Sequence, residues 1–201
     1  MTKKTIIIAT HNKGKAKEFK SLFDEYGYTV KTLHDFPEIG DVAETGTTFS
    51  ENALQKATFI SQELDTIVLA DDSGLEVDAL NGAPGVYSAR FAGEHGNDKK
   101  NNEKLLADLK NVPKEQRTAN FHCTLALVGP NKEPLFVEGN IKGLILFEPQ
   151  GENGFGYDPL FYIPELKKSM GELTDDQKNQ ISHRALAIAN LRADLDDWLH
   201  E

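Results

Sequence analysis

Two short apolar runs near the start of the chain constrain the fold more than any other feature. Residues 4–9 and 66–70 are each bounded by polar residues and are far shorter than a membrane span, which is typical of buried strands. Between them, residues 16–26 and 48–64 have the apolar spacing of amphipathic helices. Helices that separate strands favour crossover connections, so this order predicts an α/β fold with a partly parallel sheet.

The middle of the chain has a different pattern. Residues 98–109 predict a polar helix, and residues 117–128 and 135–143 predict two strands. Between these strands, Gly129-Pro130-Asn131-Lys132 supplies turn residues, which favours an antiparallel hairpin.

The last third adds one short strand over residues 160–163 and a C-terminal helix with one apolar stripe. The stripe consists of Ile188, Leu191, Leu195 and Trp198. We therefore expect a single domain over residues 1–201 with a mixed, partly parallel central sheet. Helices are expected on both sides of this sheet, and two lobes are expected to flank a substrate groove.

Charge and cysteine content exclude several classes of function. The net charge of −10 disfavours binding to nucleic acid or to anionic membrane, so an enzyme for polyphosphates needs its basic residues gathered locally. Cys123 is the only cysteine, which excludes an internal disulfide and fits the reducing cytoplasm. It lies in an apolar run, as a buried structural thiol does. No signal peptide or membrane span is expected.

The first candidate site is Thr10-His11-Asn12-Lys13-Gly14-Lys15, which joins the first strand to the first helix. Backbone N–H groups at a helix N-terminus bind anions, and the two lysines reinforce this property. The spacing differs from that of a Walker A loop. The alternative interpretation is a solvated basic loop between strand and helix.

The second candidate site is the pair Asp71-Asp72. It directly follows the apolar run 66–70 and is expected to lie where that strand ends. Oxygen ligands of this kind suit Mg²⁺, which binds one or two carboxylates together with phosphate oxygens and water. Side chains alternate along an extended chain, so one of the two aspartates is expected to face the site. Glu44 is a further candidate ligand, whereas Glu51 has an alternative role at the start of a helix. An Asx-type turn before Gly74 is the alternative for the pair.

The third candidate site is the glycine-rich segment 151–159. Glycines let the backbone approach a flat ligand, Phe155 can stack on a base, and Asp158 can accept a hydrogen bond from a ring N–H. The alternative is a glycine-rich turn whose aromatic residues anchor it to the core.

The fourth candidate site is Lys178 with Ser182-His183-Arg184 at the start of the last helix. Ser182 suits the N-cap, while the other three side chains offer hydrogen-bond donors to phosphate or to a carbonyl edge. A solvated basic helix start is the alternative. Together the four sites fit a binding site for a nucleoside polyphosphate. An acyl-transfer enzyme is a weaker interpretation, because the chain has no Gly-x-Ser-x-Gly pattern. A zinc site is weaker still, because the six histidines lack the close spacing of zinc ligands.

Six motifs lie in order along the chain, from the first strand to the last helix. They are residues 10–15, Phe49-Ser50-Glu51-Asn52-Ala53, Ala70-Asp71-Asp72-Ser73-Gly74-Leu75, Gly82-Ala83-Pro84-Gly85-Val86-Tyr87-Ser88-Ala89-Arg90, Gly154-Phe155-Gly156-Tyr157-Asp158-Pro159 and Ser182-His183-Arg184. With these motifs the chain resembles the inosine/xanthosine triphosphate pyrophosphatases. His11 is a departure, because glycine is frequent at this position in the family.

The resemblance implies a two-lobed, Mg²⁺-dependent homodimer that cleaves deaminated purine nucleoside triphosphates between the α- and β-phosphates. Asp72 would be the proton acceptor and a metal ligand, and Glu44 a second ligand. The triphosphate would be held by Thr10, His11, Asn12, Lys13, Gly14, Lys15 and Lys178, and Ser73 would also contact the substrate. The base would be read by Phe155, Gly156, Tyr157, Asp158, His183 and Arg184.

Three alternatives remain open from the sequence. A regulatory module could bind the nucleotide without turnover, and a pyrophosphatase for pyrimidine or modified-base nucleotides could use the same reaction with another pocket. A structural interaction domain would leave the four polar clusters unexplained. The sequence leaves open the preferred base, the ribose preference, the number of metal ions, the oligomeric state and the effect of His11.

Overall fold

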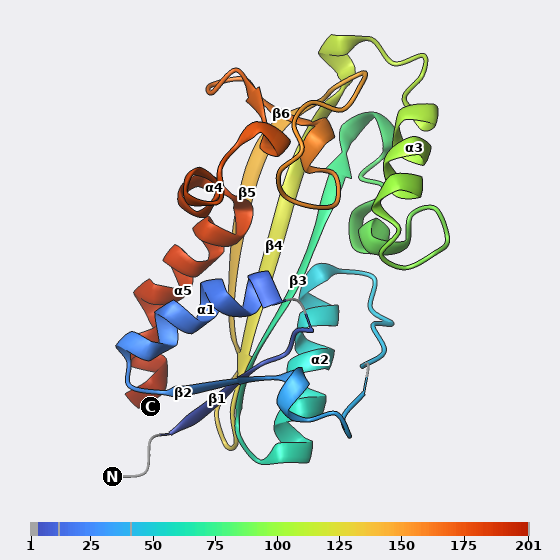
Figure 1. Cartoon of the computed structure of the whole chain (residues 1–201). Coiled ribbons are helices and arrows are strands. Elements are labelled where there is room, and N and C mark those ends of the chain that lie inside the picture. Colours follow the sequence, from blue (N-terminus) through green and yellow to red (C-terminus); the bar gives the residue numbers. More distant parts are fainter. Residues whose placement is uncertain (1–3, 12, 41, 201) are drawn as a thin grey trace. The chain divides into compact units, whose positions relative to one another are not determined.

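The computed structural model describes residues 4–11, 13–40 and 42–200, and the predicted site residue Asn12 lies outside them. The strands form one sheet in the order β2-β1-β3-β4-β5-β6-β7 (Figure 1). They are β1 (Thr5–Ile8), β2 (Thr29–Thr32), β3 (Ile67–Val77), β4 (Thr118–Val128), β5 (Leu135–Ile145), β6 (Phe161–Ile163) and β7 (Lys168–Ser169). The α-helices are α1 (Lys13–Glu25), α2 (Phe49–Leu64), α3 (Asp98–Asp108), α4 (Asp175–Ile181) and α5 (His183–His200).

The sheet is mixed, as predicted. Strand β1 pairs in parallel with β2 and with β3, and Ile7 lies opposite both Lys31 and Val68. Strand β6 pairs antiparallel with β5 and with β7. Strands β4 and β5 are neighbours joined by residues 129–134, and such a short link permits only an antiparallel pair. The predicted hairpin is therefore confirmed.

The chain folds into two compact units. Unit 1 contains Met1–Asp72, Cys123–Gly139 and Ala187–Glu201. Unit 2 contains Ser73–His122 and Asn140–Leu186.

In unit 1, helices cover both faces of the sheet because the side chains of β1 alternate. Ile6 and Ile8 are buried against α1 and α5, while Ile7 is buried against α2. In Figure 1, α1 and α5 lie side by side on one face of β1, and α2 lies on the other. Cys123 is buried in the same core as Ile6 and Ile8, as expected for a structural thiol.

Helix α2 begins where the sequence predicts it. Thr48 is the N-cap, and its Oγ1 accepts a hydrogen bond from the N–H of Glu51 at 3.1 Å. The carboxylate of Glu51 accepts in return from the N–H groups of Thr47 and Thr48 at 2.7 and 3.3 Å. This capping box satisfies N–H groups that the first helical turn leaves without partners.

Unit 2 has a separate apolar core between α3 and the sheet. Leu105 and Leu109 pack there with residues of β3, β4 and β6. Arg117 was predicted to begin the following strand, but β4 starts one residue later and the Arg117 guanidinium is buried. It donates to the carbonyl oxygens of Val112, Leu146 and Leu109 at 3.0, 2.8 and 2.7 Å, so it joins the loop after α3 to the loop after β5.

One expectation is corrected, and one strand was not predicted. Strand β3 does not end at the Asp71-Asp72 pair but continues to Val77, so neither aspartate lies in an Asx-type turn. Strand β2 was not predicted, because its polar sequence alternates between exposed and half-buried residues. Among the described residues, no helix is long and apolar enough to cross a membrane.

Candidate active site

The two adjacent aspartates of β3 are directed to opposite faces of the sheet. Asp71 Oδ2 accepts a hydrogen bond from Lys15 Nζ of α1 at 2.7 Å, whereas Asp72 Oδ2 accepts from Asn52 Nδ2 of α2 at 3.0 Å. The alternation expected from an extended chain is therefore present. Both residues are buried, with 5% of Asp71 and 8% of Asp72 exposed.

Asn52 fixes the surroundings of Asp72. Its Oδ1 accepts from the N–H of Gly46 at 2.7 Å, which leaves its Nδ2 to donate to Asp72. A Cβ at residue 46 would lie 2.6 Å from the Glu51 Cβ, so only glycine allows the loop before α2 to approach this closely. The local packing of this loop thus orients the amide that holds Asp72.

Burial and charge set the protonation of Asp72. Burial is the largest cause that raises its pKa, and the negative charge of Glu44 is the next. The hydrogen bond from Asn52 and the charge of Lys56 lower it, but the result is a pKa of about 6 instead of 3.8. Glu44 is therefore close enough for its negative charge to disfavour the ionised form of Asp72.

Lys56 lies among these carboxylates. It forms an ion pair with Glu44, and its Nζ donates to the backbone oxygen of Asp71 at 3.2 Å. Burial is the largest single effect on its pKa and lowers it, but the charges of Asp71, Glu44 and Asp72 together raise the pKa above its ordinary value. Lys56 is accordingly a charged, half-buried ammonium group.

Sequence reasoning did not assign Asn52 and Lys56 to the site. Both are polar residues on α2, four positions apart, and they border the buried stripe that contains Ala53, Ala57 and Ile60. Polar residues next to an apolar stripe at this spacing are the signal that indicates them.

The donor set of Asp72 and Glu44 fits a hard divalent cation. Within the described part of the chain, no group of three or more His, Cys, Asp or Glu side chains surrounds a common metal position. Mg²⁺ needs only one or two carboxylates, because phosphate oxygens and water complete its coordination. A cation bound by both carboxylates would relieve the repulsion by Glu44 that raises the pKa of Asp72.

The predicted phosphate segment leads into α1. Thr10 is buried, and His11 is exposed, with its carbonyl oxygen 2.9 Å from His34 Nε2. Lys13 and Gly14 begin the helix. The first turn of α1 contains no acidic residue, although acids are favoured there, so an anion would complement the helix dipole.

In unit 2, the predicted base-reading segment is a tight turn. Asp158 donates its N–H to the carbonyl oxygen of Phe155 at 3.2 Å, and the Asp158 carboxylate accepts the N–H of Phe155 at 3.0 Å. A Cβ at residue 154 would lie 2.1 Å from Asp158 Oδ2, so Gly154 is required for the close approach. The Phe155 ring is 49% exposed, which leaves a face for stacking.

Two residues of this segment have structural parts, and that of Tyr157 matches the alternative interpretation of the segment as a turn anchored to the core by its aromatic residues. The Tyr157 side chain is buried in the core of unit 2, and its hydroxyl donates to the carbonyl oxygen of Ser88 at 2.7 Å. Burial, together with the charge of Asp98, raises its pKa above the ordinary value. Gly156 has a φ of +61°, a left-handed conformation that favours glycine. The ring of Tyr157 thus anchors the turn to the core.

The structure groups Lys178 with the base-reading segment. Its Nζ lies 2.5 Å from Asp158 Oδ2 and 4.5 Å from the centre of the Phe155 ring. Its assignment to the triphosphate stays a prediction. His183 and Arg184 are buried at the start of α5, and the His183 ring stacks on Phe121 with a centroid distance of 4.9 Å.

Ser182 and Ser73 complete the predicted set. Ser182 Oγ accepts from the N–H of Ala185 at 3.2 Å, as expected of a residue that caps α5. Ser73 follows Asp72 directly in β3 and is half-buried.

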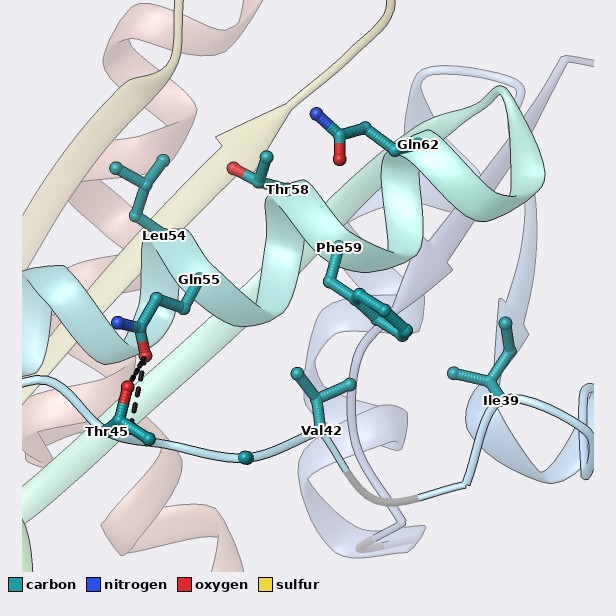
Figure 2. Close-up of a pocket in the computed structure, with 9 residues that line it drawn as sticks. Ile39, Val42, Thr45, Leu54, Gln55, Thr58, Phe59 and Gln62 are labelled. Atoms are coloured by element: carbon teal, nitrogen blue, oxygen red, sulfur yellow. Dashed lines mark hydrogen bonds between the residues drawn. The ribbon is translucent and has the colours of Figure 1, made fainter.

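A pocket of about 610 Å³ lies beside α2 within unit 1 (Figure 2). At its edge, Gln55 Oε1 accepts from the N–H and the hydroxyl of Thr45 at 3.1 and 3.3 Å. It is lined by Ile39, Val42, Ala43, Thr45, Leu54, Gln55, Thr58, Phe59 and Gln62. None of these side chains carries a charge, so the lining does not suit a triphosphate.

Comparison with known proteins decides the family. A sequence model of the Ham1 family matches residues 6–194. The chain belongs to the Ham1 family. It is 52% identical over 197 residues to a protein of Bacillus cereus named dITP/XTP pyrophosphatase, covering 97% of this chain and 96% of that protein. A protein of the same name from Listeria monocytogenes is 56% identical over 190 residues, with 94% of each chain covered.

Solved Ham1 structures share the fold of this chain. The Staphylococcus aureus Ham1 protein has a TM-score of 0.90 at 47% identity and covers 96% of this chain and 99% of its own. A Ham1 protein from Coxiella burnetii also has a TM-score of 0.90, at 39% identity, with the same coverage. The predicted α/β fold on a mixed sheet is therefore the Ham1 fold, and the family resemblance read from the sequence motifs is confirmed.

Proposed function

We propose that this chain is an Mg²⁺-dependent pyrophosphatase for deaminated purine nucleoside triphosphates, namely ITP, dITP and XTP. The observation that carries the proposal is the identity of 52–56%, over nearly the whole chain, to relatives named dITP/XTP pyrophosphatase. Water would be added across the bond between the α- and β-phosphates, giving a nucleoside monophosphate and pyrophosphate. Removing these nucleotides keeps deaminated bases out of DNA and RNA.

Unit 1 supplies the groups for the triphosphate. Asp72 and Glu44 would hold Mg²⁺, while Lys15 and Lys56 offer ammonium groups for phosphate oxygens. When bound, Mg²⁺ neutralises phosphate charge and makes a coordinated water more acidic. Asp72 would orient the attacking water and accept its proton. Its buried position makes it a stronger base than an exposed aspartate, whose pKa is about 3.9.

Unit 2 supplies the groups for the base. The exposed face of Phe155 would stack on the purine, and His183 and Arg184 would offer donors to its edge, while Lys178 of the same unit would contact the triphosphate. Hydrogen-bond donors directed at the 6-oxo group of a deaminated purine would face the 6-amino group of adenine, which is itself a donor. Such polar mismatches in a buried site discriminate between substrates by about 10⁴-fold or more. The non-catalytic nucleotide-binding module is the second candidate, since the same groups would bind without turnover.

A nucleotide panel with Mg²⁺ tests the proposal. ITP, dITP and XTP should be cleaved far faster than ATP and GTP, and free phosphate should stay near background until inorganic pyrophosphatase is added. Direct release of phosphate would indicate cleavage at the γ-phosphate and a different enzyme class. Calorimetric binding of ITP without any turnover would support the binding module instead.

We also propose that the enzyme acts as a homodimer in the cytoplasm. The lone, buried Cys123 fits a reducing compartment, and the net charge of −10 disfavours nucleic acid and anionic membrane as partners. Light scattering after size-exclusion chromatography should give twice the chain mass of 22.3 kDa. A mass of one chain at micromolar concentration would contradict the dimer.

A further inference from the structure

Gly156 is held on both sides by one face of helix α3. Its N–H donates to Asp98 Oδ2 at 2.8 Å, and its carbonyl oxygen accepts from Asn102 Nδ2 at 2.9 Å. Asp98 and Asn102 are four residues apart, so they lie on the same side of the helix. The helix therefore fixes both peptide groups that flank Gly156.

These two hydrogen bonds hold the left-handed backbone of Gly156, which steric crowding at the Cβ position does not impose. Gly156 has a φ of +61°, yet a Cβ built at this residue would meet no atom within 4 Å. Asp98 and Asn102 hydrogen-bond to both peptides of this left-handed backbone and so help to stabilise it, beside the bond from the Asp158 N–H to the Phe155 carbonyl oxygen.

The two neighbours of Gly156 have opposite environments. Tyr157 is anchored in the core by the bond from its hydroxyl to Ser88, while the Phe155 ring is half-exposed beneath the Lys178 ammonium group. With Tyr157 fixed, the torsion angles of Gly156 determine where the Phe155 ring points. A change at Gly156 would consequently move the stacking face.

Asn102 has the chemistry of a positioning residue. Its Oδ1 is buried and has no hydrogen-bond partner within the described ranges, which is unfavourable for an amide. An apolar residue of the same size would avoid this cost. The donation from Nδ2 to Gly156 is the contribution that such a residue could not make.

We propose that Asp98 and Asn102 are positioning residues for base selection. They hold the Gly156 backbone so that Phe155 is presented to a deaminated purine. The inference rests on the proposed function and extends it to helix α3, whose residues do not touch the substrate in this scheme.

The test uses variants that separate this role from helix stability. Asn102→Leu keeps the volume and favours the helix but cannot donate to Gly156. Asp98→Ala removes the acceptor, whereas Asp98→Asn keeps an acceptor oxygen and loses only the charge. Glu103→Gln, an exposed change on the same helix, is the matched control.

The full-length enzyme is assayed with ITP, ATP and inorganic tripolyphosphate, all with Mg²⁺. In Asn102→Leu and Asp98→Ala, KM for ITP should rise roughly 3–10-fold, as expected for the loss of one hydrogen bond. The ITP-to-ATP ratio of kcat/KM should fall by a similar factor. The inhibition constant of tripolyphosphate, which has no base, should be unchanged. Asp98→Asn and Glu103→Gln should behave as wild type.

Two results would overturn the inference. One is an unchanged ITP-to-ATP ratio in folded Asn102→Leu and Asp98→Ala, as judged by their melting curves. The other is equal weakening of ITP and tripolyphosphate, which would indicate general damage. A wild-type enzyme that does not hydrolyse ITP would instead contradict the proposed function, so the two failures are distinguishable.

Discussion

Replacing Asp72 by asparagine should remove turnover and, without metal, stabilise the fold. Asparagine keeps the size of the side chain and an oxygen that accepts the hydrogen bond from Asn52. It loses the charge that would bind Mg²⁺ and the capacity to accept a proton. Loss of a general base alone lowers kcat about 10²–10⁴-fold. Because asparagine is neutral, it also avoids the two costs that raise the pKa of Asp72, namely the burial of a charge and the repulsion by Glu44.

The magnitude follows from the pKa of Asp72. It rises from 3.8 to about 6 on folding, and one pKa unit corresponds to about 1.4 kcal/mol. As the pH rises from about 4 to 6, the unfolded chain loses this proton first, so the free energy of unfolding decreases through that window. At pH 8 the ionised group costs the metal-free protein at most about 3 kcal/mol. Removing this cost should raise Tm by up to about 6–12 °C for a chain of this size.

The assay is thermal unfolding of wild type and Asp72→Asn in EDTA at pH 4, 6 and 8, repeated with Mg²⁺. The Tm advantage of the variant should grow with pH, and Mg²⁺ should raise the Tm of the wild type more than that of the variant. Asp71→Asn is the matched control on the other face of β3. It keeps an acceptor oxygen but loses the negative charge that pairs with Lys15, so it should be destabilised by about 1–3 kcal/mol.

Two outcomes would refute this reasoning. An Asp72→Asn protein that melts at or below the wild-type temperature in EDTA at pH 8 would show that the charge is not unfavourable there. An active Asp72→Asn enzyme beside an inactive, folded Asp71→Asn enzyme would show that Asp71 is the catalytic carboxylate.

Three further changes test other contacts. Arg117→Met should lower the free energy of unfolding, measured by urea titration, by about 3 kcal/mol or more, because three carbonyl oxygens lose their donor. A variant as stable as wild type would contradict a structural role for the guanidinium. Phe155→Ala should raise KM for ITP roughly 5–150-fold, since stacking on one base is worth about 1–3 kcal/mol. An unchanged KM in steady-state kinetics would exclude stacking. Thr48→Ala should cost about 1 kcal/mol by removing the cap of α2, and an unaltered urea midpoint would argue against the capping box.

Local patterns predicted most of the fold. Strand β1 and helix α2 were found because an apolar run and a capping box depend only on neighbouring residues. Strand β2 was missed because Thr29–Thr32 is polar and half-buried. This segment is a strand because it pairs with β1, and its own sequence does not indicate that pairing. The extent of β3 was underestimated because two buried charges are unusual inside a strand, and Lys15 and Asn52 make them tolerable.

The candidate site was predicted in part for the same reason. Asp72 stands out as half of a carboxylate pair after an apolar run, and Phe155 as an aromatic residue among glycines. Asn52 and Lys56 are marked only by their spacing beside the apolar stripe of α2, and their roles depend on contacts with a strand that follows in the chain. Asn102 is similar, since a polar helix does not show which of its amides holds a turn 54 positions away.

The core that packs α1 against α5 has a consequence for synthesis. Phe19 and Leu22 share that core with Leu195 and Trp198, so α1 is buried in part by residues that the ribosome adds much later. Until then, the apolar side of α1 lacks its cover and is a target for chaperones or aggregation. The nascent chain must keep α1 soluble until α5 has been synthesised.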